Sequence, residues 1–265
     1  MRIYEIYDDE LNTALGCLLY YEGDKSFVVE LCENVNEWTA PLLFTKFVKD
    51  KVYTIPRDSS LKWVTERIIP SNRQNIGSIL KTHKLNEYDE MKLLELSKGR
   101  SSLDALSVKC LETLPAYIQK RQKLNIRECV LLRDGKFLCF FFDGTAKKVD
   151  LDELKDMTDV EKVIKNDRLR KSYTLLSGGY GITFNDSIDI PAAVLYDRGR
   201  KINVSLEDFI DFMQNNILDT SEGCKALDCT RQNLSYMVNQ GRISPVKVET
   251  KGNLYLKGDI KRLKS

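Results

Sequence analysis

The chain of 265 residues lacks several features that particular protein classes require. It has a single histidine, His83, which argues against a histidine base or a histidine-rich metal site. No apolar run reaches the ~18 residues of a membrane span. The first residues, Met1 to Asp8, lack the apolar stretch of a secretory signal. We therefore expect a cytoplasmic protein with no membrane partner.

Cysteine usage also excludes a secreted disulfide framework, because such frameworks are even-numbered and denser. Cys224 and Cys229 have four residues between them, which is too many for a C-x-x-C knuckle, and no partner ligands accompany them. We expect reduced, packed thiols and no metal site. The seven cysteines are Cys17, Cys32, Cys110, Cys129, Cys139, Cys224 and Cys229.

No set of residues in the chain assembles into a convincing catalytic or cofactor site. The glycine-rich segment 178–181 is not followed by Gly-Lys-Ser/Thr, and a strand follows it where a phosphate loop needs a helix. Acidic residues near 150–153 and 186–189 stand at expected strand ends or helix starts, where capping is the commoner role. Without a nucleophile–base pair, an enzyme is the least favoured function, and no cofactor is expected.

Hydrophobic periodicity predicts an α+β, multidomain protein with antiparallel β-sheet domains. We expect an N-terminal α+β domain over 1–125, with strands followed by helices. A small antiparallel α+β domain should cover 126–204. A linker helix and a DNA-binding domain should cover 205–265, where the tail from Thr220 carries nine Lys/Arg against four acidic residues. A basic module on a mildly acidic body is typical of a nucleic-acid reader.

Local signals place individual elements within these domains. In the first domain we expect a hairpin around residues 22–25, strands over 51–55 and 61–68, and helices between 71 and 124, one of them beginning at Ser102. In the second, Asp134-Gly135 and Asp143-Gly144 predict tight turns between strands, and 173–176 should pair with 181–184. A helix from Ser205 carries an apolar stripe that suits either a dimer seam or packing between domains.

The C-terminal pattern predicts two consecutive short helices. Asp219 or Thr220 should cap the first, Asp228-Cys229 should form a tight turn, and Thr230 should cap the second. Gly241 should end the second helix in left-handed geometry. The inward side chains are expected to be Cys224 and Leu227 on the first helix and Leu234, Met237 and Val238 on the second.

The outward face of the second helix carries amide and guanidinium groups, which pair with adenine and guanine in the major groove. A short hairpin follows over 245–256 and should act as a wing whose lysines contact phosphates. The candidate DNA-binding residues are Thr230, Arg231, Gln232, Asn233, Ser235, Tyr236, Asn239, Arg242, Lys247, Lys251, Asn253 and Lys257.

This pattern resembles the excisionase and MerR-type winged helix-turn-helix family over residues 219–263. The likeness rests on the Ser-Glu-x-x-Lys-x-Leu opening, the Thr-Arg-Gln start of the second helix, the Gln-Gly-Arg-Ile exit and the closing Gly-Asp-Ile. Asp228 and Cys229 depart from the glycine and valine that the family often has. The segment with Arg133-Asp-Gly-Lys136 and Gly179–Asp186 is similar to a small bacterial α+β family of unknown function, whose members also occur ahead of helix-turn-helix modules.

The resemblance implies a bacterial, sequence-specific DNA-binding transcriptional regulator, an autoregulating repressor with N-terminal sensing or assembly domains. One short recognition helix reads few base pairs, so we expect a homodimer on an inverted repeat of double-stranded DNA. The alternative is a protein-interaction adaptor that does not bind DNA, such as an antitoxin-like or phage-encoded inhibitor that uses residues 1–125. Arg67, Arg73, Gln74 and Asn75 form a polar group there, suited either to a partner contact or to a solvated helix start.

Overall fold

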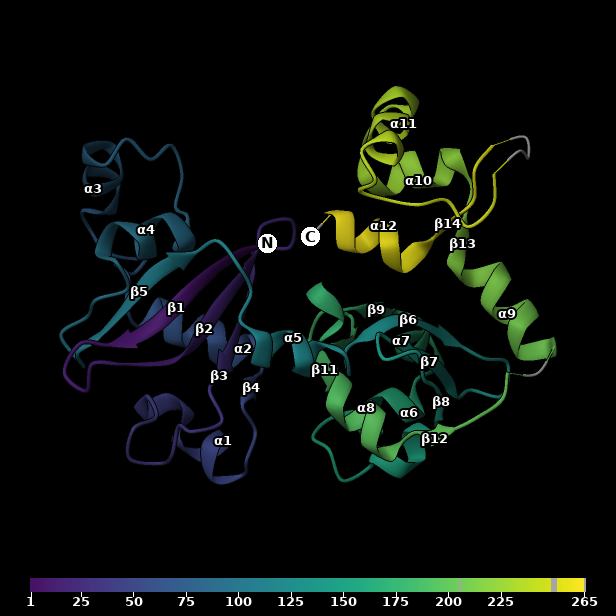
Figure 1. Ribbon diagram of the computed structural model, residues 1–265, viewed down its shortest axis with the longest axis horizontal. Coiled ribbons are helices and arrows are strands. Elements are labelled where there is room, and N and C mark those ends of the chain that lie inside the picture. Colours follow the sequence, from purple (N-terminus) through teal and green to yellow (C-terminus); the bar gives the residue numbers. More distant parts are fainter. Residues whose placement is uncertain (205, 249–251, 265) are drawn as a thin grey trace. The chain divides into compact units, whose positions relative to one another are not determined.

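A computed structural model describes residues 1–204, 206–248 and 252–264 of the chain. Its residues form two compact units, 1–118 and 119–265 (Figure 1). Both units combine helices with antiparallel sheets, as predicted. We expected domain boundaries after 125 and after 204, and the second unit contains both the expected middle domain and the C-terminal helices. No described helix has the length and apolarity needed to cross a bilayer.

Unit 1 is built on a five-stranded antiparallel sheet in the order β4-β3-β2-β1-β5. The predicted turn at 22–25 is confirmed, since it joins β2 to β3. The last strand, β5, closes the far edge by pairing with β1, more than ninety residues away in the sequence. The strands are β1 Arg2–Asp8, β2 Thr13–Tyr21, β3 Ser26–Leu31, β4 Thr54–Ile55 and β5 Leu106–Leu111.

Two secondary-structure predictions in unit 1 were wrong. The expected strand over 61–68 is mostly helix α2, Arg57–Thr65, because Ser60, Trp63 and Val64 recur at helical spacing and face the sheet. The Ser60 hydroxyl accepts the Val29 N–H and donates to the Ile55 carbonyl, which ties this helix to β3 and β4. The helix expected from Ser102 is absent, because the chain there leads into β5.

Short helices complete unit 1. The apolar side of the sheet, α2 and these helices share one core, in which Phe44, Trp63 and Leu94 are buried. The Asp89 side chain caps α4 by accepting the Lys92 N–H. These helices are η1 Leu42–Phe44, α1 Thr45–Lys49, α3 Ile76–Thr82, α4 Glu90–Ser97 and, at the border with unit 2, α5 Ala116–Gln122.

Unit 2 contains a four-stranded sheet in the order β12-β8-β7-β6 and a three-stranded sheet in the order β11-β10-β9. The tight turns predicted at 134–135 and 143–144 are confirmed, as is the pairing of 173–175 with 182–184. The strands are β6 Ile126–Leu131, β7 Phe137–Phe141, β8 Ala146–Val149, β9 Tyr173–Leu175, β10 Gly181–Phe184, β11 Ile188–Pro191 and β12 Arg200–Lys201.

Helical segments cover these sheets and bury a second core around Phe137, Phe141 and Phe184. The Asp150 side chain accepts the Asp152 N–H at the start of η2, so this acidic residue is a cap, as predicted. The segments are η2 Leu151–Leu154, α6 Val160–Lys165, α7 Asp167–Lys171, η3 Ser177–Gly179 and α8 Ala192–Arg198.

Helix α9, Leu206–Asn216, leads from the sheets to the C-terminal elements. Phe212 packs edge-on against Phe140 with ring centroids 5.1 Å apart, and Asn216 donates to the Cys129 carbonyl. Phe209 and Ile210, two members of the predicted stripe, are exposed. The elements that follow are β13 Ile217–Leu218, α10 Thr220–Leu227, α11 Arg231–Asn239, β14 Tyr255–Leu256 and α12 Lys257–Lys264.

Candidate nucleic-acid interface

Helices α10 and α11 are held by a small apolar core of their own. Its buried members are Leu234, Ile243, Tyr255 and Ile260, from α11, the segment after it, β14 and α12. Figure 1 shows α10 between α11 and α12, which agrees with its packing against both helices. The inward residues predicted from the sequence are confirmed, since they pack against this core: Cys224, Leu227, Leu234, Met237 and Val238.

The connection between the two helices is short and well defined. Asp219 caps α10 in a capping box with Glu222, and Asp228 ends the helix in left-handed geometry, with φ 52° and ψ 49°. The Thr230 side chain then caps α11 by accepting the Asn233 N–H at 3.2 Å. Gly241 follows α11 with φ 69°. Each of these four caps and turns agrees with the sequence-based prediction.

The exposed face of α11 is made of uncharged polar side chains. Gln232, Ser235, Tyr236 and Asn239 are all exposed, and their spacing of three and four residues places them on one side of the helix. Asn233 is exposed at the edge of this face. Because the opposite stripe is packed into the core, apolar packing sets the direction in which the polar face points.

The other predicted site residues divide into those that face solvent and those that serve the fold. Arg231 is exposed, and its Nη2 donates to the Ser221 hydroxyl of α10 at 2.9 Å. Thr230 is exposed but acts as the cap of α11. Asn253 is half-buried, because its backbone exchanges hydrogen bonds with the Thr220 hydroxyl and its side chain donates to Tyr255. Asn253 therefore supports the structure and is the least available of the predicted contacts.

The segment after α11 doubles back on itself beside the helices. The Val246 N–H donates to the Leu254 carbonyl, and the Leu254 N–H donates to the Lys247 carbonyl. β14 then pairs with β13 in antiparallel fashion. Lys251, a predicted phosphate contact, lies outside the described residues.

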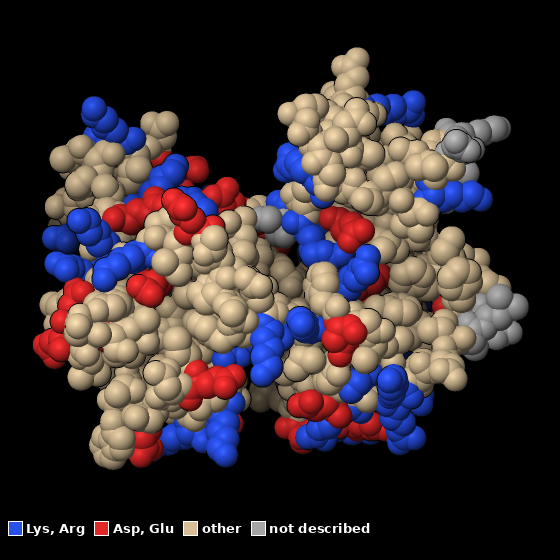
Figure 2. Space-filling model, viewed as in Figure 1, with Lys and Arg blue, Asp and Glu red and all other residues tan. Residues whose placement is uncertain are grey.

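Exposed cations occur on the segments next to α11 in the sequence and on the neighbouring helices. Arg242, Lys247 and Lys257 are exposed, and none of them forms an ion pair within the described part of the chain. Lys225 on α10 shares this property, although it is not among the contacts predicted from the sequence. Figure 2 shows lysine and arginine atoms on both flanks of this part of unit 2. The C-terminal region therefore combines a neutral polar helix face with exposed positive charge.

Two features of the region were missed at the sequence level. Ser221 holds the Arg231 side chain, but the two residues lie ten positions apart and no local pattern links them. Glu128 on β6 is buried at 4% exposure and accepts the Gly258 N–H at 2.6 Å, which fastens α12 to the sheet. Lys261 and Arg262 add contacts from α12 to the carbonyls of Leu175 and Arg127.

The polar group predicted in unit 1 is not brought together. Arg67 is buried and pairs with Asp104, whereas Arg73, Gln74 and Asn75 are exposed. In the described residues, no group of three or more His, Cys, Asp or Glu side chains is arranged to hold a metal ion. Comparison of the chain with models of protein families, with curated proteins and with solved structures found no match.

Proposed function

We propose that the chain is a sequence-specific DNA-binding regulator and that residues 219–263 are its winged helix-turn-helix. The observation that carries the proposal is the exposed face of α11, where Gln232, Ser235, Tyr236 and Asn239 lie on one side of a rigidly packed helix. Amide and hydroxyl groups presented in this way suit the base edges of the major groove. The surrounding cations suit the phosphates on either side.

Within this proposal, the doubled-back segment after α11 acts as the wing. Lys247 lies on its first limb, and Lys257 begins the helix after its second limb. Cations at these places neutralise phosphate without reading sequence, so they set affinity and register. Arg231, which Ser221 holds against α10, is expected to contact a phosphate or a base at the start of the recognition helix.

A homodimer on an inverted repeat completes the proposal, because one short helix reads only a few base pairs. The two half-sites would then be about one helical turn, ~34 Å, apart. The apolar side chains of α9 that remain exposed, Phe209 at 51% and Ile210 at 39%, are the candidate seam. The regulator would be cytoplasmic and would control its own transcription.

The test is binding of the full-length protein to double-stranded DNA, measured by fluorescence anisotropy over a salt series. The ligands are DNA from upstream of its own coding sequence and sites selected from a random duplex library. Gln232→Ala should cost about 1–3 kcal/mol on the preferred site if Gln232 pairs with a base. Gln74→Ala, which removes an exposed glutamine of unit 1, is the matched control and should change nothing.

Lys247→Ala provides a second, different readout. It should weaken binding to all sequences alike and reduce the slope of log K against log salt by about 1. Lys46→Ala, an exposed lysine of unit 1, should leave that slope unchanged. If the protein shows no binding above the weak nonspecific level, or if both substitutions are silent, the alternative of a protein adaptor that does not bind DNA replaces this proposal.

A further inference from the structure

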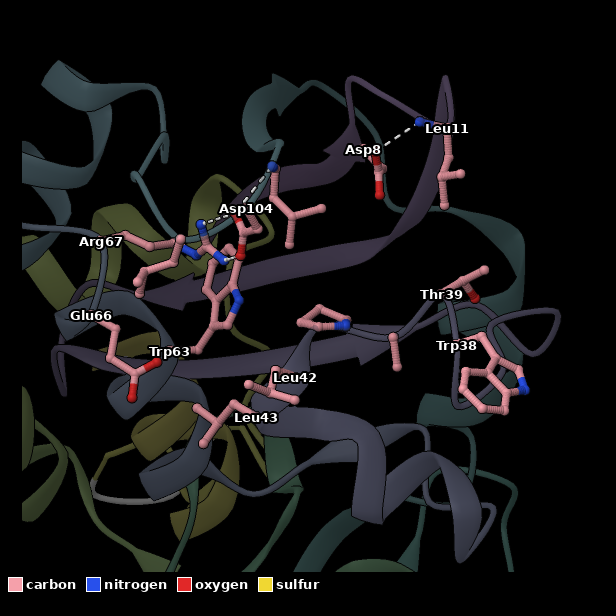
Figure 3. Close-up of a pocket in the computed structure, with 14 residues that line it drawn as sticks. Asp8, Leu11, Trp38, Thr39, Leu42, Leu43, Trp63, Glu66, Arg67 and Asp104 are labelled. Atoms are coloured by element: carbon pink, nitrogen blue, oxygen red, sulfur yellow. Dashed lines mark hydrogen bonds and ion pairs between the residues drawn. The ribbon is translucent and has the colours of Figure 1, made fainter.

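A hollow in unit 1 brings together the two tryptophans of the chain, Trp38 and Trp63. Its volume is about 570 Å³. Trp63 on α2 forms part of the wall and is buried, whereas Trp38 stands at the rim and is 87% exposed (Figure 3). The indole N–H of Trp63 has no acceptor among the described residues. The wall of the hollow therefore contains a buried hydrogen-bond donor that has no partner in the described part of the chain.

Four large apolar side chains stand exposed around this hollow. Leu42 is 93% exposed, Leu103 is 73% exposed and Leu11 is 54% exposed, and all three line the hollow with Trp38. Single exposed apolar residues are ordinary, but several large ones gathered around one depression mark an interaction site. Trp in particular is a common anchor of protein–protein interfaces.

The charges of the hollow indicate what it can accept. Arg67 stacks on the Trp63 ring, 4.1 Å from its centroid, and forms a two-point ion pair with Asp104, so this cation is already neutralised. Asp8 and Glu66 also line the hollow, and neither forms an ion pair with another described residue. Figure 3 shows these two carboxylates on opposite sides of the space. Because Arg67 is paired with Asp104, the charge left on the lining of the hollow is the negative charge of Asp8 and Glu66.

We propose that this hollow binds a segment of a partner protein that places a large apolar side chain between Trp38, Leu42 and Leu103. Basic residues on either side of that anchor would face Asp8 and Glu66. A small molecule is a poorer fit, because small-ligand pockets enclose most of the ligand's surface, whereas this hollow has a wide rim of exposed side chains. The site is separate from the DNA-binding surface and gives unit 1 a role in recruitment.

The test uses the full-length chain and a phage-displayed library of random 12-residue peptides. Enriched peptides are synthesised with phenylalanine in place of any tryptophan and are titrated against the protein. Since both tryptophans of the chain line the hollow, intrinsic tryptophan emission reports on this site alone. We expect enriched peptides to carry an apolar anchor flanked by Lys or Arg and to shift the emission to shorter wavelength in a saturable way. Trp38→Phe should remove most of that shift.

Substitutions at the rim locate the binding. Leu42→Asp and Leu103→Asp should each weaken the peptide affinity at least tenfold, and Glu66→Lys should weaken it for the basic peptides. Leu96→Asp changes an equally apolar side chain on α4 that is exposed but does not line the hollow, so it should have no effect. Because Leu42 and Leu103 are exposed, these variants should keep the wild-type circular dichroism and melting temperature.

Three outcomes would overturn the proposal. Peptide binding that is indifferent to Leu42→Asp and Leu103→Asp would place the site elsewhere. Enrichment of acidic peptides would contradict the charge argument. A wild-type emission spectrum without the long-wavelength component of an exposed Trp38 would show that another segment or a second copy of the chain already covers the hollow. None of these outcomes depends on whether the chain binds DNA.

Discussion

Removing the carboxylate of Glu128 should loosen the attachment of α12 to the sheet of unit 2. Oε2 accepts the Gly258 N–H at 2.6 Å and Oε1 accepts the Cys129 N–H at 3.1 Å, in a site where Glu128 is almost wholly buried. The approach is close, since a Cβ on Gly258 would lie 2.6 Å from the Arg127 carbonyl.

The expected magnitude follows from these two hydrogen bonds. A buried N–H that loses its acceptor costs about 1–3 kcal/mol, so Glu128→Ala should lower the free energy of unfolding by about 2–6 kcal/mol. Glu128→Gln keeps one acceptor oxygen and presents an amide NH₂ to the other N–H. At low pH it should therefore lower the free energy of unfolding by roughly half as much as Glu128→Ala does. Gly258→Ala should also destabilise the same contact, because its Cβ has no room.

The pH dependence gives the sharper test. Burial raises the pKa of Glu128 above its ordinary value of 4.5, although the N–H groups of Gly258 and Cys129 and the charge of Arg262 act in the opposite direction. A carboxyl whose pKa is raised in the folded state stabilises the protein fully below pH 4.5, and this contribution is lost as the pH rises through the folded pKa. Glutamine cannot ionise, so the deficit of Glu128→Gln should shrink between pH 4 and pH 8.

The assay is denaturant unfolding followed by far-UV circular dichroism at several pH values. Glu161→Gln is the control, because Lys165 lowers the pKa of the exposed Glu161 and gives a pH dependence of the opposite sign. A deficit of Glu128→Gln that grows with rising pH would refute the reasoning about burial. An unfolding midpoint unchanged in Glu128→Ala would refute the role of this contact.

Three further predictions concern stability. Asp104→Asn should cost about 1–3 kcal/mol at pH 7, a reduced figure for a partly exposed partner of a buried Arg67. Burial acts to raise the pKa of Asp104, but the Arg67 hydrogen bond and charge lower it below its ordinary value of 3.8. This stabilisation is present at pH 7 and is lost as the pH falls through the folded pKa, so the deficit of Asp104→Asn should shrink in unfolding measured at successively lower pH below 3.8. Leu234→Ala should cost about 2–5 kcal/mol and abolish DNA binding, since it empties the small core beneath α11; an unchanged melting temperature would contradict this. Asp228→Gly should raise the stability by up to about 1 kcal/mol because glycine adopts left-handed geometry without strain, and a lower melting temperature would show that the Asp228 side chain has another role.

Local chemistry made the turns and caps predictable. Asp-Gly between two apolar strands favours a tight turn, as at Asp134-Gly135, and Thr230 and Asp219 cap helices through atoms only three residues away. The packed stripe of α10 and α11 was equally predictable from the sequence, because helical spacing alone determines which side chains share a face. The candidate recognition face followed from that stripe.

Contacts between distant segments were not predictable in the same way. The apolar pattern of 61–65 is compatible with either a strand or a helix, and only the fit of Trp63 and Val64 against the sheet decides for α2. Residues 106–111 form strand β5 because they pair with the free edge of β1. The burial of Glu128 beneath α12 and the meeting of Trp38, Trp63 and Leu103 around one hollow likewise depend on packing between segments far apart in the chain. The sequence by itself determined the local elements and the polar face of α11, whereas the tertiary structure decided which of those elements meet, because burial and pairing are properties of two surfaces and not of one segment.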